Sequence, residues 1–290
     1  MTTSAGPLQQ RAEVLSLKRV GAYHHLTLVA PGVAERFRPG QFAALAVGGP
    51  ESALLLRRSF SIYRVRDSGT YGGTVEIIFA VTGKGTAWLA DLVPHDVVDV
   101  VAPLGRPFAL PKEAVSCALV AGGYGSAPMF ALSGRLLDRG CAVHMVLGAS
   151  TESRLFGALE ARRSAQSVIV TTEDGSVGIK GRVTDVLPEV LERTGSAVVY
   201  ACGPMGMLAA VAQVAETHGA WSQCAVEEAM ACGVGVCMTC VLPVIGEDGR
   251  TRMVRSCVEG PVFRGDRVRW SDVGTVPEGT LGAPSGGWPQ

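Results

Sequence analysis

The hydrophobic rhythm of the chain changes once, near Cys117, and this change constrains the fold more than any other feature. Before it, short segments rich in β-branched residues are separated by turn signals such as Pro39-Gly40, which is typical of antiparallel strands. After it, apolar segments alternate with segments of helical periodicity, which is typical of a parallel sheet with crossover helices. The sequence therefore predicts a β barrel followed by an α/β domain.

The first region predicts one short helix, Thr86–Leu92, and six strands that fit a small antiparallel barrel. These strands are Glu13–Leu17, His25–Val29, Gln41–Val47, Ser59–Val65, Thr74–Val81 and Val97–Val101. The second region predicts five strands and four helices in alternation. In chain order they are Cys117–Ala121, Ala127–Asp138, Cys141–Leu147, Leu155–Arg162, Ser167–Thr172, Arg182–Arg193, Ala197–Ala201, Met205–Thr217 and Ser222–Val226.

Length and composition indicate folded domains along most of the chain. It has 290 residues, of which 47% are hydrophobic, too many for a disordered protein. We expect a barrel domain over residues 8–110, an α/β domain over 111–226 and a small cysteine-rich domain over 227–272. The tail, 273–290, is rich in glycine and proline, and we expect it to be disordered.

Charge and processing signals exclude several classes of function. The 26 basic residues balance the 26 acidic ones, so no overall field favours nucleic acid or an anionic membrane. The first residues lack the basic and apolar regions of a signal peptide. The longest uncharged stretch, Ala114–Gly134, has three glycines and a proline in its middle, which fits a strand-turn-helix better than a membrane span. We expect a cytoplasmic protein that binds neither nucleic acid nor a membrane.

Four cysteines stand in the order C-x4-C-x2-C-x16-C, at Cys232, Cys237, Cys240 and Cys257. This is the spacing of plant-type ferredoxins, in which a wrapped loop supplies three thiolates and a remote cysteine the fourth. The alternatives are a structural zinc site, which typically uses two C-x2-C pairs, and four ordinary buried thiols. The sequence favours a 2Fe–2S cluster. Core packing is the better interpretation for the thiols of Cys117, Cys141 and Cys224.

The segment Leu56–Tyr63 reads Leu-Arg-Arg-Ser-Phe-Ser-Ile-Tyr at the start of a barrel strand. Taken alone, it is an ordinary strand with two basic residues. The functional interpretation is that a guanidinium binds the pyrophosphate of FAD, an aromatic ring lies against the isoalloxazine and a hydroxyl reaches N5. Further along, Gly83–Thr86 opens the short helix and could present amides to an anion, although a plain helix entry explains it equally well.

Three motifs in the α/β domain point to a nucleotide. Leu119–Pro128 runs from a strand through glycines into a helix, which lets the backbone approach a pyrophosphate, although it does not match G-x-G-x-x-G. Cys202–Met205 follows a strand whose carboxyl end lies in the same crevice; the alternative is a helix with Pro204 in its first turn. Glu173-Asp174 follows another strand, and these carboxylates favour NAD over NADP if they meet the adenosine ribose. The alternatives are that the pair is a solvated acidic loop, or that Arg154 points into the same site and attracts the 2′-phosphate of NADP.

The order of these features resembles the ferredoxin-NADP reductase family, and the whole chain from Glu13 to Trp270 resembles the electron-transfer subunits of NAD-dependent (class 1B) dihydroorotate dehydrogenases. The motifs that carry the resemblance are Arg58–Ser61, Gly122–Gly125, Thr172–Ser176, Cys202–Gly206, Met230–Gly233 and Cys257–Phe263. The resemblance implies a six-stranded antiparallel flavin barrel, a parallel-sheet nucleotide-binding domain and a small C-terminal 2Fe–2S domain. Phe60 departs from the pattern, because ferredoxin reductases have tyrosine there.

The resemblance also implies the site residues. Arg58, Ser59, Phe60, Ser61, Gly83, Gly85 and Thr86 would bind FAD. Gly122, Gly123, Gly125, Glu173, Asp174, Cys202 and Gly203 would bind NAD, with Ser61 and Cys202 as catalytic residues. Cys232, Cys237, Cys240 and Cys257 would hold the cluster.

The expected function is an oxidoreductase subunit that passes electrons between NAD and a catalytic FMN-containing subunit, which oxidises dihydroorotate to orotate in pyrimidine biosynthesis. The two subunits are expected to form a heterotetramer. A TIM barrel needs about 250 residues, so we expect the pyrimidine site on the partner. Two alternatives are a subunit of an NADPH–ferredoxin oxidoreductase and a non-catalytic iron–sulfur redox sensor.

Overall fold

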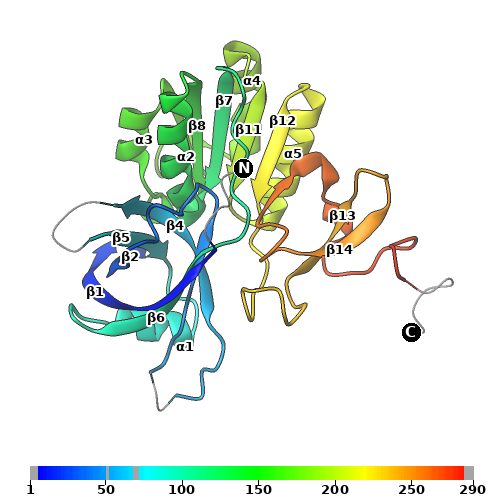
Figure 1. The fold of residues 1–290 in the computed structure, drawn as a ribbon. Helices are drawn as coiled ribbons and strands as arrows, with labels where there is room; N and C mark the ends of the chain where they lie inside the picture. The colour runs from blue at the N-terminus through cyan, green and yellow to red at the C-terminus, as the bar shows by residue number, and fades with distance from the viewer. Residues whose placement is uncertain (1–5, 50–51, 68–71, 284–290) are drawn as a thin grey trace.

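The N-terminal part of the chain folds into a closed six-stranded antiparallel barrel (Figure 1). The computed structural model describes residues 6–49, 52–67 and 72–283. Helix α1 (Lys84–Ala90) follows β5 in sequence, and the strand order around the barrel is β1-β2-β5-β4-β3-β6. The bounds are β1 Leu8–Val20, β2 Tyr23–Val29, β3 Phe42–Leu45, β4 Arg58–Arg66, β5 Thr74–Phe79 and β6 Val97–Leu104. The predicted barrel is confirmed.

Strand β5 is buried along its whole length because its two faces serve two cores. Val75, Ile77 and Phe79 pack inside the barrel. Ile78, which points the other way, packs into the core of the α/β domain. This alternation is the period of two expected of a strand, and it joins the barrel directly to the next domain.

A seven-stranded sheet follows, in the order β10-β9-β8-β7-β11-β12-β15. Its first six strands are parallel and β15 is antiparallel to β12. Helices α2 (Ala127–Asp138) and α3 (Ala158–Ser164) pack on one face, and α4 (Val183–Thr194) and α5 (Met205–Thr217) on the other. The strands are β7 Ser116–Gly122, β8 Ala142–Ala149, β9 Ser167–Thr172, β10 Ile179–Lys180, β11 Val198–Cys202, β12 Trp221–Ala225 and β15 Val262–Arg264. The predicted parallel sheet is confirmed, with β10 and β15 as additions.

The cysteine-rich segment contributes to two sheets. Strands β13 (Val241–Ile245) and β14 (Thr251–Arg255) form an antiparallel hairpin, and β15 extends the sheet of the α/β domain. Strand β15, which lies beyond the expected boundary at residue 226, thus completes the sheet of the α/β domain.

The start of the tail differs from the expected disorder. Thr280 is 5% exposed, and the amide of Leu281 donates to the carbonyl of Thr251 at 2.8 Å. This part of the tail is thus tied to β14 at Leu281. Residues 284–290, which share the same prediction, lie outside the described residues.

Polar and aromatic contacts join the barrel to helix α3. The hydroxyl of Tyr63 donates to the carboxylate of Glu160, and Arg64 pairs with the same carboxylate at 2.5 Å. The ring of Tyr63 packs edge-on against Phe130 and Phe156. Such mixed contacts orient the two domains relative to each other.

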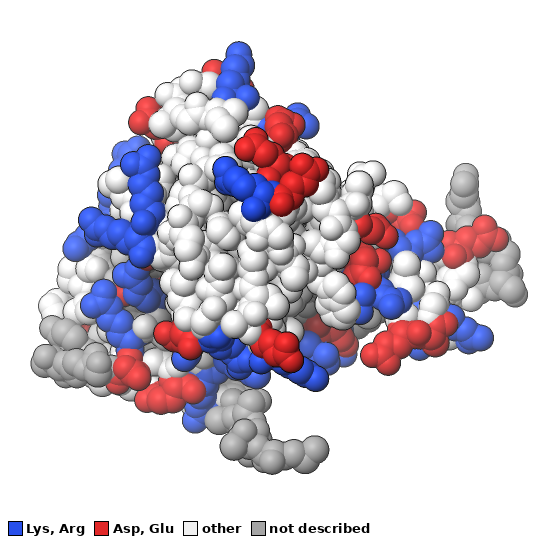
Figure 2. All heavy atoms as spheres, turned by 90° about the horizontal axis from the view of Figure 1, so that it is seen from above, with Lys and Arg blue, Asp and Glu red and all other residues white. Residues whose placement is uncertain are grey.

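The surface carries charges of both signs. Figure 2 shows basic side chains along one edge of the face seen from above, with acidic and basic side chains mixed elsewhere. Among the described residues, no helix is long and apolar enough to cross a membrane.

Candidate functional site

Two of the four cysteines of the predicted cluster site, Cys240 and Cys257, lie against the barrel. Cys240 and Cys257 are each 2% exposed and pack with Phe42, Ala44 and Leu104 of the barrel. Burial, and then the neighbouring Cys240, raises the pKa of the Cys257 thiol to about 12. The remote fourth cysteine of the pattern is thus folded back onto the third.

The outer pair, Cys232 and Cys237, lies nearer the surface, where the two thiols interact with each other. Within the described ranges, no three His, Cys, Asp or Glu side chains are placed to hold a single metal ion. The sulfurs form two pairs, and two irons held by four thiolates need two each. The residues present therefore fit a 2Fe–2S cluster.

Backbone amides surround the outer sulfurs. The amides of Val234 and Val236 donate to the Cys232 sulfur at 3.4 and 3.3 Å, because Gly233 and Gly235 adopt positive φ angles of 72° and 83°. The hydroxyl and then the amide of Thr239 lower the pKa of the Cys237 thiol to about 6. Hydrogen bonds to sulfur favour the thiolate that iron binds and tune the potential of a cluster.

The flavin motif and the glycine-rich helix entry come together at one end of the barrel. A Cβ atom on Gly85 would stand 3.0 Å from Nε of Arg58, so the guanidinium lies over the first turn of α1. The hydroxyl of Thr86 accepts from the amides of Thr82 and Gly83 at 2.8 and 3.1 Å. Thr86 therefore shapes the loop, and the phosphate-binding role of Arg58, Gly83 and Gly85 remains a prediction.

The two neighbouring arginines differ. Arg57 pairs with Asp99 at 2.6 Å, whereas within the described part of the chain Arg58 donates only to the carbonyls of Leu56 and Arg57. Arg58 is thus the arginine of the motif that remains available to an anion.

The cluster loop touches the flavin motif. Strand β4 pairs with β3 so that Ser59 stands opposite Ala44 and Ser61 opposite Phe42. A Cβ atom on Gly233 would lie 3.5 Å from Cβ of Ala44 and 3.7 Å from Oγ of Ser59. The loop between the first two cysteines therefore rests on the strands that carry the motif.

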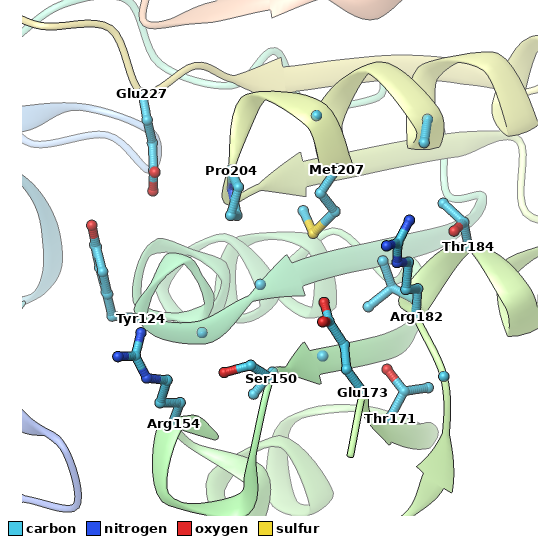
Figure 3. Close-up of a pocket in the computed structure, with 18 of the residues that line it drawn as sticks. Tyr124, Ser150, Arg154, Thr171, Glu173, Arg182, Thr184, Pro204, Met207 and Glu227 are labelled. Carbon is cyan, nitrogen blue, oxygen red and sulfur yellow. The ribbon is translucent and has the colours of Figure 1, made fainter. Parts of the chain in front are cut away.

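A cavity of about 480 Å³ opens at the carboxyl ends of β7, β8, β9 and β11 (Figure 3). The chain runs outward from β7 through β8 to β9 and then returns to the other side of β7 as β11. Crevices at such a switch point bind nucleotides in open α/β sheets. The lining residues are Tyr23, Gly122, Gly123, Tyr124, Gly148, Ala149, Ser150, Arg154, Thr171, Glu173, Gly181, Arg182, Val183, Thr184, Pro204, Gly206, Met207, Ala210 and Glu227.

Three of the predicted nucleotide residues line this cavity, namely Gly122, Gly123 and Glu173. Gly125 and Gly203 lie beneath it, where the two glycine turns touch: a Cβ on Gly125 would stand 2.9 Å from Cα of Gly203. These two glycines let the turns after β7 and β11 pack closely, which shapes the cavity floor.

Two predicted residues lie apart from the lining. The Asp174 carboxylate accepts from the amide and hydroxyl of Ser176 at 2.9 and 2.7 Å, as part of an exposed turn. Cys202 is 2% exposed in the core of the α/β domain, and burial raises the pKa of its thiol far above the usual range. The cofactor role predicted for Asp174 and the catalytic role predicted for Cys202 remain predictions.

The barrel contributes to the cavity through Tyr23. Its hydroxyl donates to the carbonyl of Arg154 at 2.6 Å, and the amide of Ala22 donates to Ser153 at 3.2 Å. Arg154 also lines the cavity, and it is the residue that, on the sequence alone, could counteract the preference of Glu173 for NAD. The β1–β2 turn thus holds the segment that carries Arg154.

Two further residues at this end, Tyr124 and Glu227, are not among the predicted site residues. The ring of Tyr124 packs edge-on against Tyr23 at 5.6 Å, and Figure 3 shows its hydroxyl pointing toward Glu227. Burial raises the pKa of the Glu227 carboxyl. Tyr124 lies within the glycine motif Gly122–Gly125, but Glu227 belongs to no motif, and only the fold brings the two residues together.

Barrel, nucleotide crevice and paired cysteines define an oxidoreductase of the ferredoxin-reductase type with an added iron–sulfur domain. The family model of the oxidoreductase NAD-binding domain matches residues 119–213, and the model of the iron–sulfur cluster binding domain of dihydroorotate dehydrogenase B matches residues 227–269. The electron transfer subunit of dihydroorotate dehydrogenase B (NAD(+)) from Desulforamulus reducens is 33% identical over 89% of this chain and 97% of that protein. Its counterpart from Geobacillus thermodenitrificans is 36% identical over 90% and 98%. The chain belongs to the family of electron transfer subunits of dihydroorotate dehydrogenase B.

Solved structures show the same architecture. A chain of the NADH-dependent reduced ferredoxin-NADP oxidoreductase has a TM-score of 0.78 at 27% identity, covering 94% of this chain and 93% of that one. A ferredoxin NADP+ reductase from Neisseria gonorrhoeae, solved with bound FAD and NADP, has a TM-score of 0.60 at 18% identity, covering 73% and 92%. The second similarity concerns the fold alone.

Proposed function

We propose that this chain carries electrons between NAD and a catalytic FMN-containing subunit that oxidises dihydroorotate to orotate. The observation that carries the proposal is the contact of Gly233, in the cluster loop, with Ser59 and Ala44 of the flavin-motif strands. The nucleotide cavity reaches the same barrel at Tyr23. The nucleotide cavity and the cysteine loop thus both reach the barrel that carries the flavin motif, as a relay from two-electron to one-electron transfer would require.

The cofactors supply the electron chemistry, since FAD accepts a hydride and releases single electrons while a 2Fe–2S cluster carries single electrons. The chain's own residues bind and orient them. Arg58 would bind the flavin pyrophosphate, Phe60 would lie against the ring, and the exposed Ser61 would direct its hydroxyl to N5. Glu173 would accept from the ribose hydroxyls of NAD. The two cysteine pairs would hold the cluster beside Ser59.

The partner would dock on the cluster loop. Between Cys232 and Cys240 the loop has no charged side chain. Val234, Val236 and Met238 are 48%, 79% and 52% exposed. An apolar surface over a one-electron carrier can be covered by another protein without desolvating charge. We propose that the catalytic subunit covers it, and that two copies of each subunit form a heterotetramer.

The decisive experiment compares the isolated chain with the reconstituted pair. The isolated chain should reduce ferricyanide with NADH but should not oxidise dihydroorotate. With the catalytic FMN subunit added, a stable complex should elute from a sizing column and orotate-linked NAD reduction should appear. Dihydroorotate oxidation by the isolated chain, or two subunits that elute apart without coupled activity, would show the proposal to be wrong.

A charge in the docking surface tests the partner separately. Val236→Asp should slow the coupled reaction by about tenfold or more while ferricyanide reduction stays near the wild-type rate, because a buried unpaired carboxylate costs more than about 1.4 kcal/mol. Leu159→Asp, at a 75% exposed position on α3, is the control and should leave both rates unchanged. Equal effects of the two substitutions on the coupled rate would contradict docking at this loop.

The same measurements separate the two alternatives. A non-catalytic redox sensor would show no NADH-dependent ferricyanide reduction. An NADPH–ferredoxin oxidoreductase subunit would use NADPH in preference to NADH and would not couple to dihydroorotate oxidation.

A further inference from the structure

The two ends of the nucleotide cavity differ in their neighbours, which sets the direction of a bound dinucleotide. Tyr23 of the barrel lies at one end, beside Tyr124 and Arg154. Figure 3 shows Glu173 and Arg182 toward the opposite end, on the side of α4. If the cavity binds NAD as proposed above, the nicotinamide must lie at the end that reaches the barrel, because the barrel carries the flavin motif. The adenosine half then lies between Glu173 and Arg182.

Arg182 has a fixed backbone and an available side chain. Its amide donates to the Asp185 carboxylate at 2.7 Å, and the preceding amide of Gly181 donates to the carbonyl of Thr172 at 2.9 Å. Among the described residues, its guanidinium has neither a hydrogen-bond nor an ion-pair partner, and Arg182 lines the cavity. An exposed positive charge, fixed only through its backbone, therefore stands at the adenosine end of the cavity.

Glu173 is held on the adjoining wall. Its amide donates to the carbonyl of Ala149 at 3.1 Å, which ties the end of β9 to the end of β8. Nearby, Thr171 is fully buried and lines the cavity, and its hydroxyl has no partner among the residues that the structure describes. A buried hydroxyl is normally satisfied, so the unpaired hydroxyl of Thr171 leaves a polar group in need of a partner in the wall at this end of the cavity.

We propose that Arg182 is a latent binding residue for the ribose 2′-phosphate of NADPH, and that Glu173 alone prevents its use. A 2′-phosphate carries close to two negative charges, which the Glu173 carboxylate repels, whereas a free ribose diol donates to that carboxylate. The guanidinium of Arg182 matches a phosphate in charge and shape. The coenzyme preference of this family member therefore depends on the balance of one acidic and one basic residue at the same end of the cavity.

The inference predicts the outcome of a double-mutant cycle with two probes, 5′-AMP and 2′,5′-ADP, measured by equilibrium binding to the full chain. Glu173→Gln should strengthen 2′,5′-ADP binding by about tenfold or more, the effect of one charge-assisted hydrogen bond freed from repulsion. Adding Arg182→Ala should remove that gain. The alanine keeps the amide that contacts Asp185, so the start of α4 is preserved.

Two further variants keep the test sharp. Arg182→Lys, combined with Glu173→Gln, should retain part of the gain in 2′,5′-ADP affinity. Lysine keeps the positive charge but loses the bidentate geometry of the guanidinium. Glu152→Gln removes an exposed carboxylate outside the cavity lining and should leave 2′,5′-ADP binding unchanged. The ratio of kcat/KM for NADPH over NADH, with ferricyanide as acceptor, should follow the binding data.

Three results would overturn the inference. A gain from Glu173→Gln that persists without Arg182 would assign the phosphate to another group, such as Arg154. No gain from Glu173→Gln would remove the carboxylate from its excluding role. If the wild-type chain bound neither 5′-AMP nor NADH, the nucleotide site of the proposed function would fail, whereas the first two results leave that site intact.

Discussion

The contact between Tyr23 and the segment that carries Arg154 predicts that the barrel controls nucleotide affinity. Tyr23 is 5% exposed, and its hydroxyl donates to the Arg154 carbonyl at 2.6 Å. Tyr23→Phe removes one buried hydrogen bond and leaves that carbonyl without its partner, at a cost of about 1–2 kcal/mol. If the cost falls on the nucleotide-bound state, KM for NADH should rise about 5- to 30-fold with kcat little changed.

A second tyrosine at the same interface is the matched control. Tyr63 is also 5% exposed and donates to Glu160, but it does not line the cavity. Tyr63→Phe should lower the melting temperature by a comparable amount and leave KM for NADH unchanged. The assay is NADH–ferricyanide reduction over a range of NADH concentrations, with thermal unfolding of each variant measured in parallel. An unchanged KM in Tyr23→Phe, or equal changes in KM in both variants, would refute the argument.

Two further predictions concern the cofactors. Cys257→Ser should lose the paramagnetic resonance of the reduced cluster while FAD is retained, because serine binds iron less well than thiolate. The control, Cys224→Ser, changes a thiol in the core of the α/β domain and should keep the signal. A full signal in Cys257→Ser would contradict the ligand assignment. Arg58→Ala should purify with much less FAD, since a charge-assisted contact to phosphate contributes about 1.5–3 kcal/mol. Arg57→Ala, which breaks the pair with Asp99, should retain more flavin than Arg58→Ala, and the reverse order would transfer the pyrophosphate to Arg57.

Local pattern was enough to predict most of the architecture. Helices α2 and α5 begin and end at the predicted residues, and β9 does too. These elements have clear boundary signals, such as Pro128, which marks the first turn of α2. The short strands β10 and β15 escaped prediction because each is held by its neighbours in the sheet rather than by its own sequence.

The tail was mispredicted in part for the same reason. Its glycines and prolines indicate disorder by composition, but Leu281 bonds to Thr251 of the hairpin. Composition describes the conformational preference of an isolated segment. It carries no information about a carbonyl on a neighbouring strand that can accept a hydrogen bond from the segment.

The sequence by itself determined the chemistry available to this protein: the spacing of four cysteines, the run of residues at Arg58–Ser61 and the glycine turn after β7 each carry their meaning over a few residues. Only the tertiary structure decided which groups meet. It placed Gly233 against Ser59, turned Asp174 out of the cavity and joined Tyr23 to Arg154. The physical reason is distance along the chain. A motif records contacts between residues a few positions apart, whereas the contacts of Tyr23 with Arg154 and of Gly233 with Ser59 join segments more than one hundred residues apart, which only the packing of the whole fold specifies.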